Sequence, residues 1–188
     1  MKRAIAFLLV LLGFACSSQD KPIHESEIVK KEPSEKVAID FDLSLGITNL
    51  VDNSYNMSVN LDLEPGAYVV SPYSEDTTYM HFNMFFPETN MLKANSDLLE
   101  EPRSVEEFDP ILARKVRFIR EKTTFQKKLT VLTTSDFEIE GRITFMIEPR
   151  CVPYDVVFSL KQSQGKLSIK QTEIAIASSY YPNRFPKQ

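Results

Sequence analysis

The thiols of Cys16 and Cys151 are the most reactive side chains of this 188-residue chain. A thiolate can attack a disulfide, carry a lipid or bind a metal, and a nearby cation favours the thiolate over the thiol. Arg150 directly precedes Cys151, so we expect Arg150 to lower the pKa of the thiol if the two side chains meet. The plainer alternative is that Cys151 is a small buried residue beside a strand.

Other catalytic and metal-binding patterns are missing from the sequence. His24 and His81 are the only histidines, and neither a three-histidine site nor a four-thiolate zinc site can be assembled. We find no Ser-His-Asp spacing and no carboxylate pair, and we expect His81 on the solvated face of a strand. Five glycines form no phosphate-binding loop, and a net charge of −4 gives no basic surface. We therefore expect no cofactor, no resident metal and no nucleic-acid partner.

Residues 1–15 have the pattern of an export signal. A positive pair at residues 2–3 precedes an apolar run at 4–12, which is too short to span a bilayer. Residues 13–15, Gly-Phe-Ala, then lead to Cys16. The pattern resembles a bacterial lipoprotein signal, although the glycine and the phenylalanine depart from the usual motif before the cysteine. Cleavage as an ordinary signal after residue 15 is the alternative.

A lipoprotein signal implies that Cys16 carries the lipid and ties the protein to a membrane of the cell envelope. By the same resemblance, Ser17 in place of aspartate favours the outer membrane over the inner one, with the protein facing the periplasm or the surface. Residues 16–36 are charged and contain two prolines, with too little apolar surface to fold. This segment, which includes His24, is predicted to be a flexible tether.

From residue 37 to residue 188 the sequence predicts one all-β domain. Apolar side chains alternate with polar ones from Tyr55 to Leu63 and from Phe137 to Ile147, as in half-buried strands. Four shorter segments fit further strands: 80–86, 125–131, 156–160 and 167–170. Many short strands separated by turns indicate a β-sandwich. Only residues 105–115 have helical character, and Pro110 interrupts them.

The order of these features resembles the N-terminal, immunoglobulin-like periplasmic domain of the thiol:disulfide interchange protein DsbD. Four segments within residues 38–170 carry the resemblance: the strand–turn–strand at 61–70, the acidic-aromatic segment at 106–109, the strand at 137–147, and Cys-Val-Pro-Tyr at 151–154 before an apolar strand. The resemblance implies an immunoglobulin-like β-sandwich of the DsbD N-terminal type, here as a stand-alone lipoprotein. It also implies that Glu107 and Phe108 form a cap that contacts a partner, with Phe108 over the sulfur of Cys151.

The chemistry of that family needs two cysteines about six residues apart, one that exchanges and one that resolves the mixed disulfide. Cys151 matches the second position, but Phe145 stands at the first, and residues 141–150 contain no cysteine. Disulfide cycling within one site is therefore not expected. Restoring the pair by Phe145→Cys should allow a bridge to Cys151 if the two Cα atoms lie within about 7 Å.

The sequence leaves functions of different classes open. The first is a non-catalytic binding or accessory module that docks another envelope protein around Cys151 and Phe108. The second is a single-thiol disulfide-exchange protein, in which Cys151 forms mixed disulfides with a thiol-redox partner; any enzymatic activity would then be protein-disulfide reduction. The accessibility of Cys151 distinguishes the two. The third is the binding of a small hydrophobic ligand between the sheets. A ligand surface could also be lined by six tyrosines: Tyr68, Tyr73, Tyr79, Tyr154, Tyr180 and Tyr181.

Overall fold

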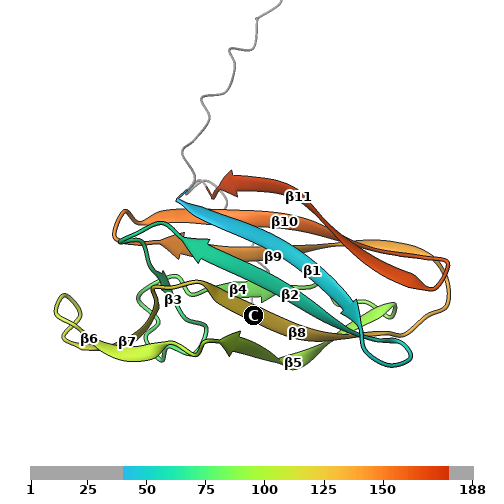
Figure 1. Ribbon diagram of the computed structural model, residues 1–188, viewed down its shortest axis with the longest axis horizontal. Coiled ribbons are helices and arrows are strands. Elements are labelled where there is room, and N and C mark those ends of the chain that lie inside the picture. Colours follow the sequence, from blue (N-terminus) through green and yellow to red (C-terminus); the bar gives the residue numbers. More distant parts are fainter. Residues whose placement is uncertain (1–39, 178–188) are drawn as a thin grey trace, which may run out of the picture. The chain divides into compact units, whose positions relative to one another are not determined.

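The computed structural model describes residues 40–177, and all regular structure there is β-strand (Figure 1). No helix within this range is long and apolar enough to cross a membrane. The all-β class predicted from the sequence is therefore confirmed. The predicted signal at 1–15 and the tether at 16–36, with Cys16 and His24, lie outside the described residues, as do Tyr180 and Tyr181.

Two four-stranded antiparallel sheets form the body of the domain. The first sheet has the order β1 (Phe41–Asn49), β2 (Ser54–Leu63), β8 (Thr123–Val131), β5 (Leu92–Glu101). The second has the order β11 (Lys166–Ile176), β10 (Val152–Ser163), β9 (Phe137–Ile147), β4 (Asn83–Phe85). The long alternating segments predicted at 55–63 and 137–147 are β2 and β9. The alternation predicted at 80–86 gives only the short β4.

The apolar faces of the two sheets share one core, which is the arrangement of a β-sandwich. Phe82, just before β4, stacks on Phe125 of β8 with ring centroids 3.7 Å apart. Phe41 of β1 meets Phe145 of β9 edge to face at 5.0 Å. Aromatic rings thus fill the space between the sheets at these places. Alternate residues of a strand project to one face of its sheet, which is how the strands direct such rings into the core.

Gly141 in β9 leaves room for a large side chain of the neighbouring strand. It lies opposite Phe158 of β10, and a Cβ atom on Gly141 would be 2.3 Å from Cζ of the Phe158 ring. The ring of Phe158, which is fully buried, therefore occupies the place of the missing side chain. A glycine is needed here for packing and not for a special backbone conformation.

A third sheet, in the order β3 (Val69–Val70), β7 (Arg114–Ile119), β6 (Val105–Asp109), lies at one end of the sandwich (Figure 1). A bridge between Tyr68 and Glu148 joins it to the turn that connects β9 and β10. We call this sheet, together with the β9–β10 turn, the hairpin end. Its small core consists of Val70, Val116 and Phe118.

The helical character expected at 105–115 is wrong, because this segment forms the β6–β7 hairpin. Pro110 lies in the turn between the strands. The side chain of Asp109 accepts hydrogen bonds from the backbone N–H groups of Ile111 at 2.7 Å and Leu112 at 3.2 Å. An aspartate that binds backbone amides two or three residues ahead stabilises a turn in place of a continuing helix.

Candidate functional site

Cys151 lies in the tight turn between β9 and β10, where its side chain is exposed. The backbone there has φ = 54°, a left-handed conformation that few non-glycine residues adopt. The Sγ atom donates a hydrogen bond to Oε2 of Glu148 at 3.2 Å. Glu148 itself is only 4% exposed, so a buried carboxylate lies directly beneath an accessible thiol.

Glu148, and not Arg150, sets the charge around the thiol. The hydrogen bond to Glu148 and its negative charge raise the pKa of Cys151 above its usual value. The guanidinium of Arg150 forms an ion pair with Asp40. The expected lowering of the thiol pKa by Arg150 therefore does not occur. The thiol form is favoured at neutral pH, which makes Cys151 a weak nucleophile despite its exposure.

Tyr68 connects the Cys151 turn to the third sheet. Its backbone exchanges two hydrogen bonds with the backbone of Glu148, at 3.0 and 2.8 Å. Burial, and then the charge of Glu148, raise the pKa of Tyr68, whereas Arg120 lowers it. The Cζ atom of Arg120 lies 4.4 Å from the centroid of the Tyr68 ring, within the range of a cation–π contact.

Glu107 is connected to Tyr68 through Arg120. The guanidinium donates from Nε to Oε1 and from Nη2 to Oε2 of Glu107, each at 2.9 Å, which is the two-pronged geometry of a well-formed arginine–carboxylate pair. The structure thus links Glu107 to Tyr68 through Arg120, and Tyr68 to Cys151 through Glu148. Sequence reasoning missed Arg120, which directly follows β7 and belongs to no motif.

Phe108 occupies a different face of the hairpin. Residues 106–109, which include the predicted cap, belong to β6. Phe108 is 66% exposed and lies opposite Lys115 of β7. Cross-strand partners project to the same side, and Lys115 alternates with the buried Val116. The register therefore places Phe108 on the side of the hairpin opposite Val116, and its exposure rules out a core position.

Phe145, the residue at which the resemblance would require a first cysteine, is fully buried in β9. It pairs with Tyr154 of β10 and packs against Phe41. Two residues of β10 lie between Tyr154 and Cys151, and three residue steps along a strand span about 10 Å. Because a disulfide needs Cα atoms within about 7 Å, the bridge considered for Phe145→Cys is not expected to form.

Buried polar side chains stabilise the rest of the hairpin end. The hydroxyl of Tyr79 donates to Oδ2 of Asp109 at 2.8 Å. This bond lowers the pKa of Asp109 and raises the pKa of Tyr79 to about 12. Tyr68 and Tyr79 both pack against Phe118 in an edge-to-face arrangement. Of the tyrosines considered as ligand-lining, these two lie together, whereas Tyr154 is buried in the main core.

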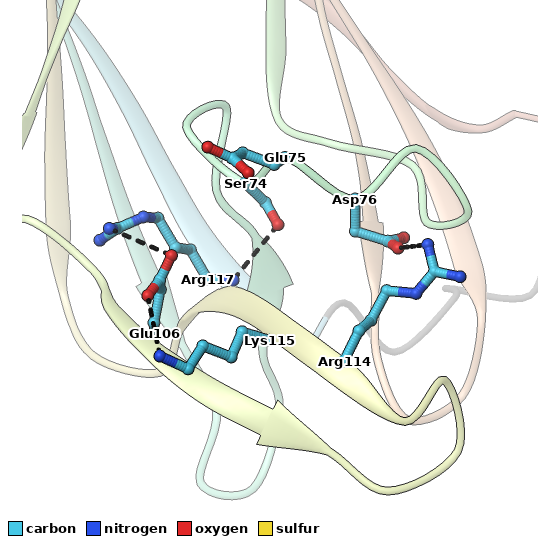
Figure 2. Close-up of a pocket in the computed structure, with 7 residues that line it drawn as sticks. All are labelled: Ser74, Glu75, Asp76, Glu106, Arg114, Lys115 and Arg117. Carbon is cyan, nitrogen blue, oxygen red and sulfur yellow. Dashed lines mark hydrogen bonds and ion pairs between the residues drawn. The ribbon is translucent and has the colours of Figure 1, made fainter.

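A cavity of about 360 Å³ lies on the outer side of the hairpin. Its lining residues come from the loop after β3 and from β6 and β7: Ser74, Glu75, Asp76, Glu106, Arg114, Lys115 and Arg117. Figure 2 shows Glu106 between Lys115 and Arg117 on one side, with Asp76 and Arg114 paired on the other.

His81 does not lie on a solvated strand face as expected. It is half-buried, and its Nε2 contacts the backbone carbonyl of Asp76. His81 therefore helps to hold the loop that carries Asp76 against the rest of the domain. The position follows from the shortness of β4, which begins at Asn83, so that His81 forms only a single bridge to Val70.

Within residues 40–177, no three His, Cys, Asp or Glu side chains are grouped to hold a metal ion. Comparison of the sequence with protein-family models and with curated proteins finds no match. The residues of the site themselves determine what chemistry it can support. They provide one exposed thiol over a buried carboxylate, a charged cavity, and a hairpin with exposed apolar side chains.

Proposed function

We propose that this chain is a lipid-anchored envelope protein whose domain is a non-catalytic binding or accessory module. In this proposal the domain is an immunoglobulin-like sandwich of the DsbD N-terminal type, Cys16 carries the lipid, and the outer membrane is the favoured site. The hairpin end docks another envelope protein, with the thiol-redox proteins of the envelope as the first class to test.

The observation that supports this proposal is the exposed apolar surface of the β6–β7 hairpin. Val105, Phe108 and Ile111 are 72%, 66% and 85% exposed. Burial of each of these apolar side chains would lower the free energy of the protein. Three such side chains on one short hairpin contribute little to the fold. The strand register places Val105 and Phe108 on opposite faces of the hairpin, with Ile111 in the turn. The hairpin therefore presents apolar side chains to a partner from both faces and from its tip, and exposed apolar side chains of this kind are typical of protein contacts. The raised thiol pKa and the missing second cysteine argue against a catalytic role.

Site-specific photo-crosslinking in the native envelope tests the proposal. A photoreactive residue at position 108 or 111 should give a discrete crosslinked partner band, and the same residue at Lys170, an exposed position on β11, should not. Replacement of Ile111 by serine in the position-108 protein should weaken the band. Equal labelling from positions 108 and 170 would refute docking through the hairpin.

The alternative is single-thiol exchange at Cys151, and the exposure of this cysteine favours it. The Cys151 thiolate would attack one sulfur of a partner disulfide and release the other sulfur as a thiolate. A partner thiol must then resolve the mixed disulfide, because no second cysteine of the site is available. This function leaves reductant-sensitive adducts that disappear in Cys151→Ser, whereas docking alone gives crosslinks that are unchanged by reductant and by Cys151→Ser.

A further inference from the structure

We propose that the cavity beside the hairpin binds the carboxylate of an acidic peptide segment, with Glu106 occupying that position in the unbound protein. The inference deepens the proposed docking function, on which it rests, by naming the chemistry of the partner. The seven lining residues include three basic and three acidic side chains, so the cavity has no excess of positive charge. Whether it can bind an anion therefore depends on which of its cations are already firmly paired.

Arg117 is the cation that the fold fixes in place. Its Nη1 donates to the backbone carbonyl of Ser104 at 2.9 Å, and its backbone N–H donates to Oγ of Ser74 at 3.3 Å. The side chain is only 28% exposed. A guanidinium held from behind by a carbonyl keeps its other nitrogens directed at the cavity, so little conformational entropy is lost when it binds an anion.

Glu106 binds the two cations loosely. Its Oε1 is 3.5 Å from Nη2 of Arg117, and its Oε2 is 3.8 Å from Nζ of Lys115. Both distances exceed the 2.7–2.9 Å of a good charge-assisted hydrogen bond. Glu106 is 41% exposed and Lys115 73% exposed, and ion pairs in such positions are weak. An external carboxylate with better geometry can therefore replace Glu106.

The opposite wall of the cavity does not compete for that anion. Arg114 donates to Oδ2 of Asp76 at 2.9 Å, and the backbone N–H of Thr78 donates to Oδ1 at 2.7 Å. Asp76 is buried with both carboxylate oxygens occupied. This wall is an internally neutralised pair, so displacement of Glu106 leaves Lys115 and Arg117 as the cations that an incoming group meets (Figure 2). Glu75 is the remaining acidic lining residue, and its exposed carboxylate is screened by water and salt.

Phe108 favours a peptide over a bare anion as the occupant. It shares its strand face with Glu106, two residues away, and with its cross-strand partner Lys115. An extended segment with a carboxylate in the cavity would place a neighbouring apolar side chain on Phe108, which is otherwise exposed. Charge and apolar surface are thus adjacent, which suits an acidic segment that also contains an apolar residue.

The test uses the full chain and a fluorescently labelled peptide in which two glutamates flank one phenylalanine, with binding followed by anisotropy. The matched peptide has glutamines in place of the glutamates. We expect the acidic peptide to bind more tightly by about tenfold or more, as expected for charge-assisted bonds. Its affinity should fall as salt is added, because exposed charges are screened. Equal binding of the two peptides would overturn the inference.

Two substitutions locate the binding. Lys115→Gln, at a position too exposed to affect folding strongly, should weaken the acidic peptide about two- to fivefold. Glu106→Gln should strengthen it by a similar factor, because it removes the internal competitor. Lys170→Gln on β11 is the matched control. Weaker binding by Glu106→Gln, or equal binding by Lys115→Gln and Lys170→Gln, would exclude this cavity.

The result also separates this inference from the proposed docking function. Crosslinks from position 108 without binding of the acidic peptide would leave docking intact and reject the carboxylate site. Anionic phospholipid vesicles should not bind in a Lys115-dependent way. If they do so and the peptide does not bind, the cavity faces a membrane surface and the peptide inference is wrong.

Discussion

The sandwich core and the hairpin end are stabilised in opposite ways. In the core, apolar side chains such as Val59, Leu61 and Ile143 are fully buried, and the two sheets meet through stacked aromatic rings. The hairpin end has a small apolar core, keeps Asp109 and Glu148 buried, and leaves large apolar side chains in water. The core therefore gains its stability from burial, and the hairpin end depends on specific polar bonds.

This contrast bears on function because the two regions use their residues differently. Polar bonds fix the geometry of the hairpin end without requiring its apolar side chains, which stay available for a partner. In the core, by contrast, the large apolar side chains are buried and stabilise the fold, so they are not available to a partner.

The same substitution at one site in each region gives the largest contrast. Ile143→Ala removes a fully buried side chain from β9 and should lower the free energy of unfolding by about 2–5 kcal/mol. Ile111→Ala, at an 85% exposed position of the hairpin turn, should change it by less than about 0.5 kcal/mol. Urea unfolding of both variants measures the difference. Similar losses would mean that the hairpin end also depends on apolar burial.

Gly141→Ala tests how tightly the core is packed. The new Cβ would overlap the buried ring of Phe158, and overpacking of this kind costs about 1–3 kcal/mol. The same substitution in a Phe158→Leu background should cost less, because the overlapping ring is gone. A double-mutant cycle by urea unfolding measures the coupling. If the two costs are equal, the contact between Gly141 and Phe158 does not limit the packing.

Much of the sandwich could be predicted from the sequence, because strands that bury one face impose period two on their own residues. The alternations at 55–63 and 137–147 gave β2 and β9 directly. At 105–115 the same logic failed. Val105, Phe108 and Ile111 are spaced by three residues, which suggests a helix, but all three are exposed. The spacing of apolar residues indicates secondary structure only where those residues are buried on one face. At 105–115 they are exposed, so their spacing carries no information about the backbone.

The candidate site was predictable only in part. The resemblance pointed to Glu107 and Cys151, and the structure links both to Tyr68. Glu148 is three residues from Cys151 in the sequence, but its role as the partner of the thiol depends on a turn with a left-handed Cys151. Arg120 reaches Glu107 across the hairpin. Such contacts depend on backbone conformation and strand register, which residue types alone do not specify.

Asp109→Asn should weaken the hairpin end in a pH-dependent way. The pKa of Asp109 is lowered chiefly by the hydrogen bond from Tyr79, so the folded state favours the ionised form. That stability is present above the ordinary aspartate pKa of about 3.9 and is lost as the pH falls through the lower, folded-state value. Wild type should exceed the variant in stability at pH 7 and approach it in acid.

Urea midpoints between pH 7 and pH 3 measure this difference, with Asp42→Asn on an exposed position of β1 as the matched control. Tyr79→Phe should reproduce part of the loss, since it removes the donor to Asp109. A gap between wild type and Asp109→Asn that stays constant across this range would show that the carboxylate charge contributes nothing to the hairpin end.

The smallest expected effect concerns the chemistry of Cys151 and leaves the fold nearly unchanged. Glu148 raises the pKa of this thiol through a hydrogen bond and its charge, so Glu148→Gln should move the rate–pH curve for modification of Cys151 to lower pH. In chains with Cys16→Ser, reaction with an aromatic disulfide at pH 7.5 should become about two- to tenfold faster, with lower thiolate nucleophilicity offsetting part of the gain. Glu173→Gln on exposed β11 is the control. An unchanged curve would mean that the buried carboxylate does not control the thiol, and the pKa of Cys151 would then no longer argue against the exchange function.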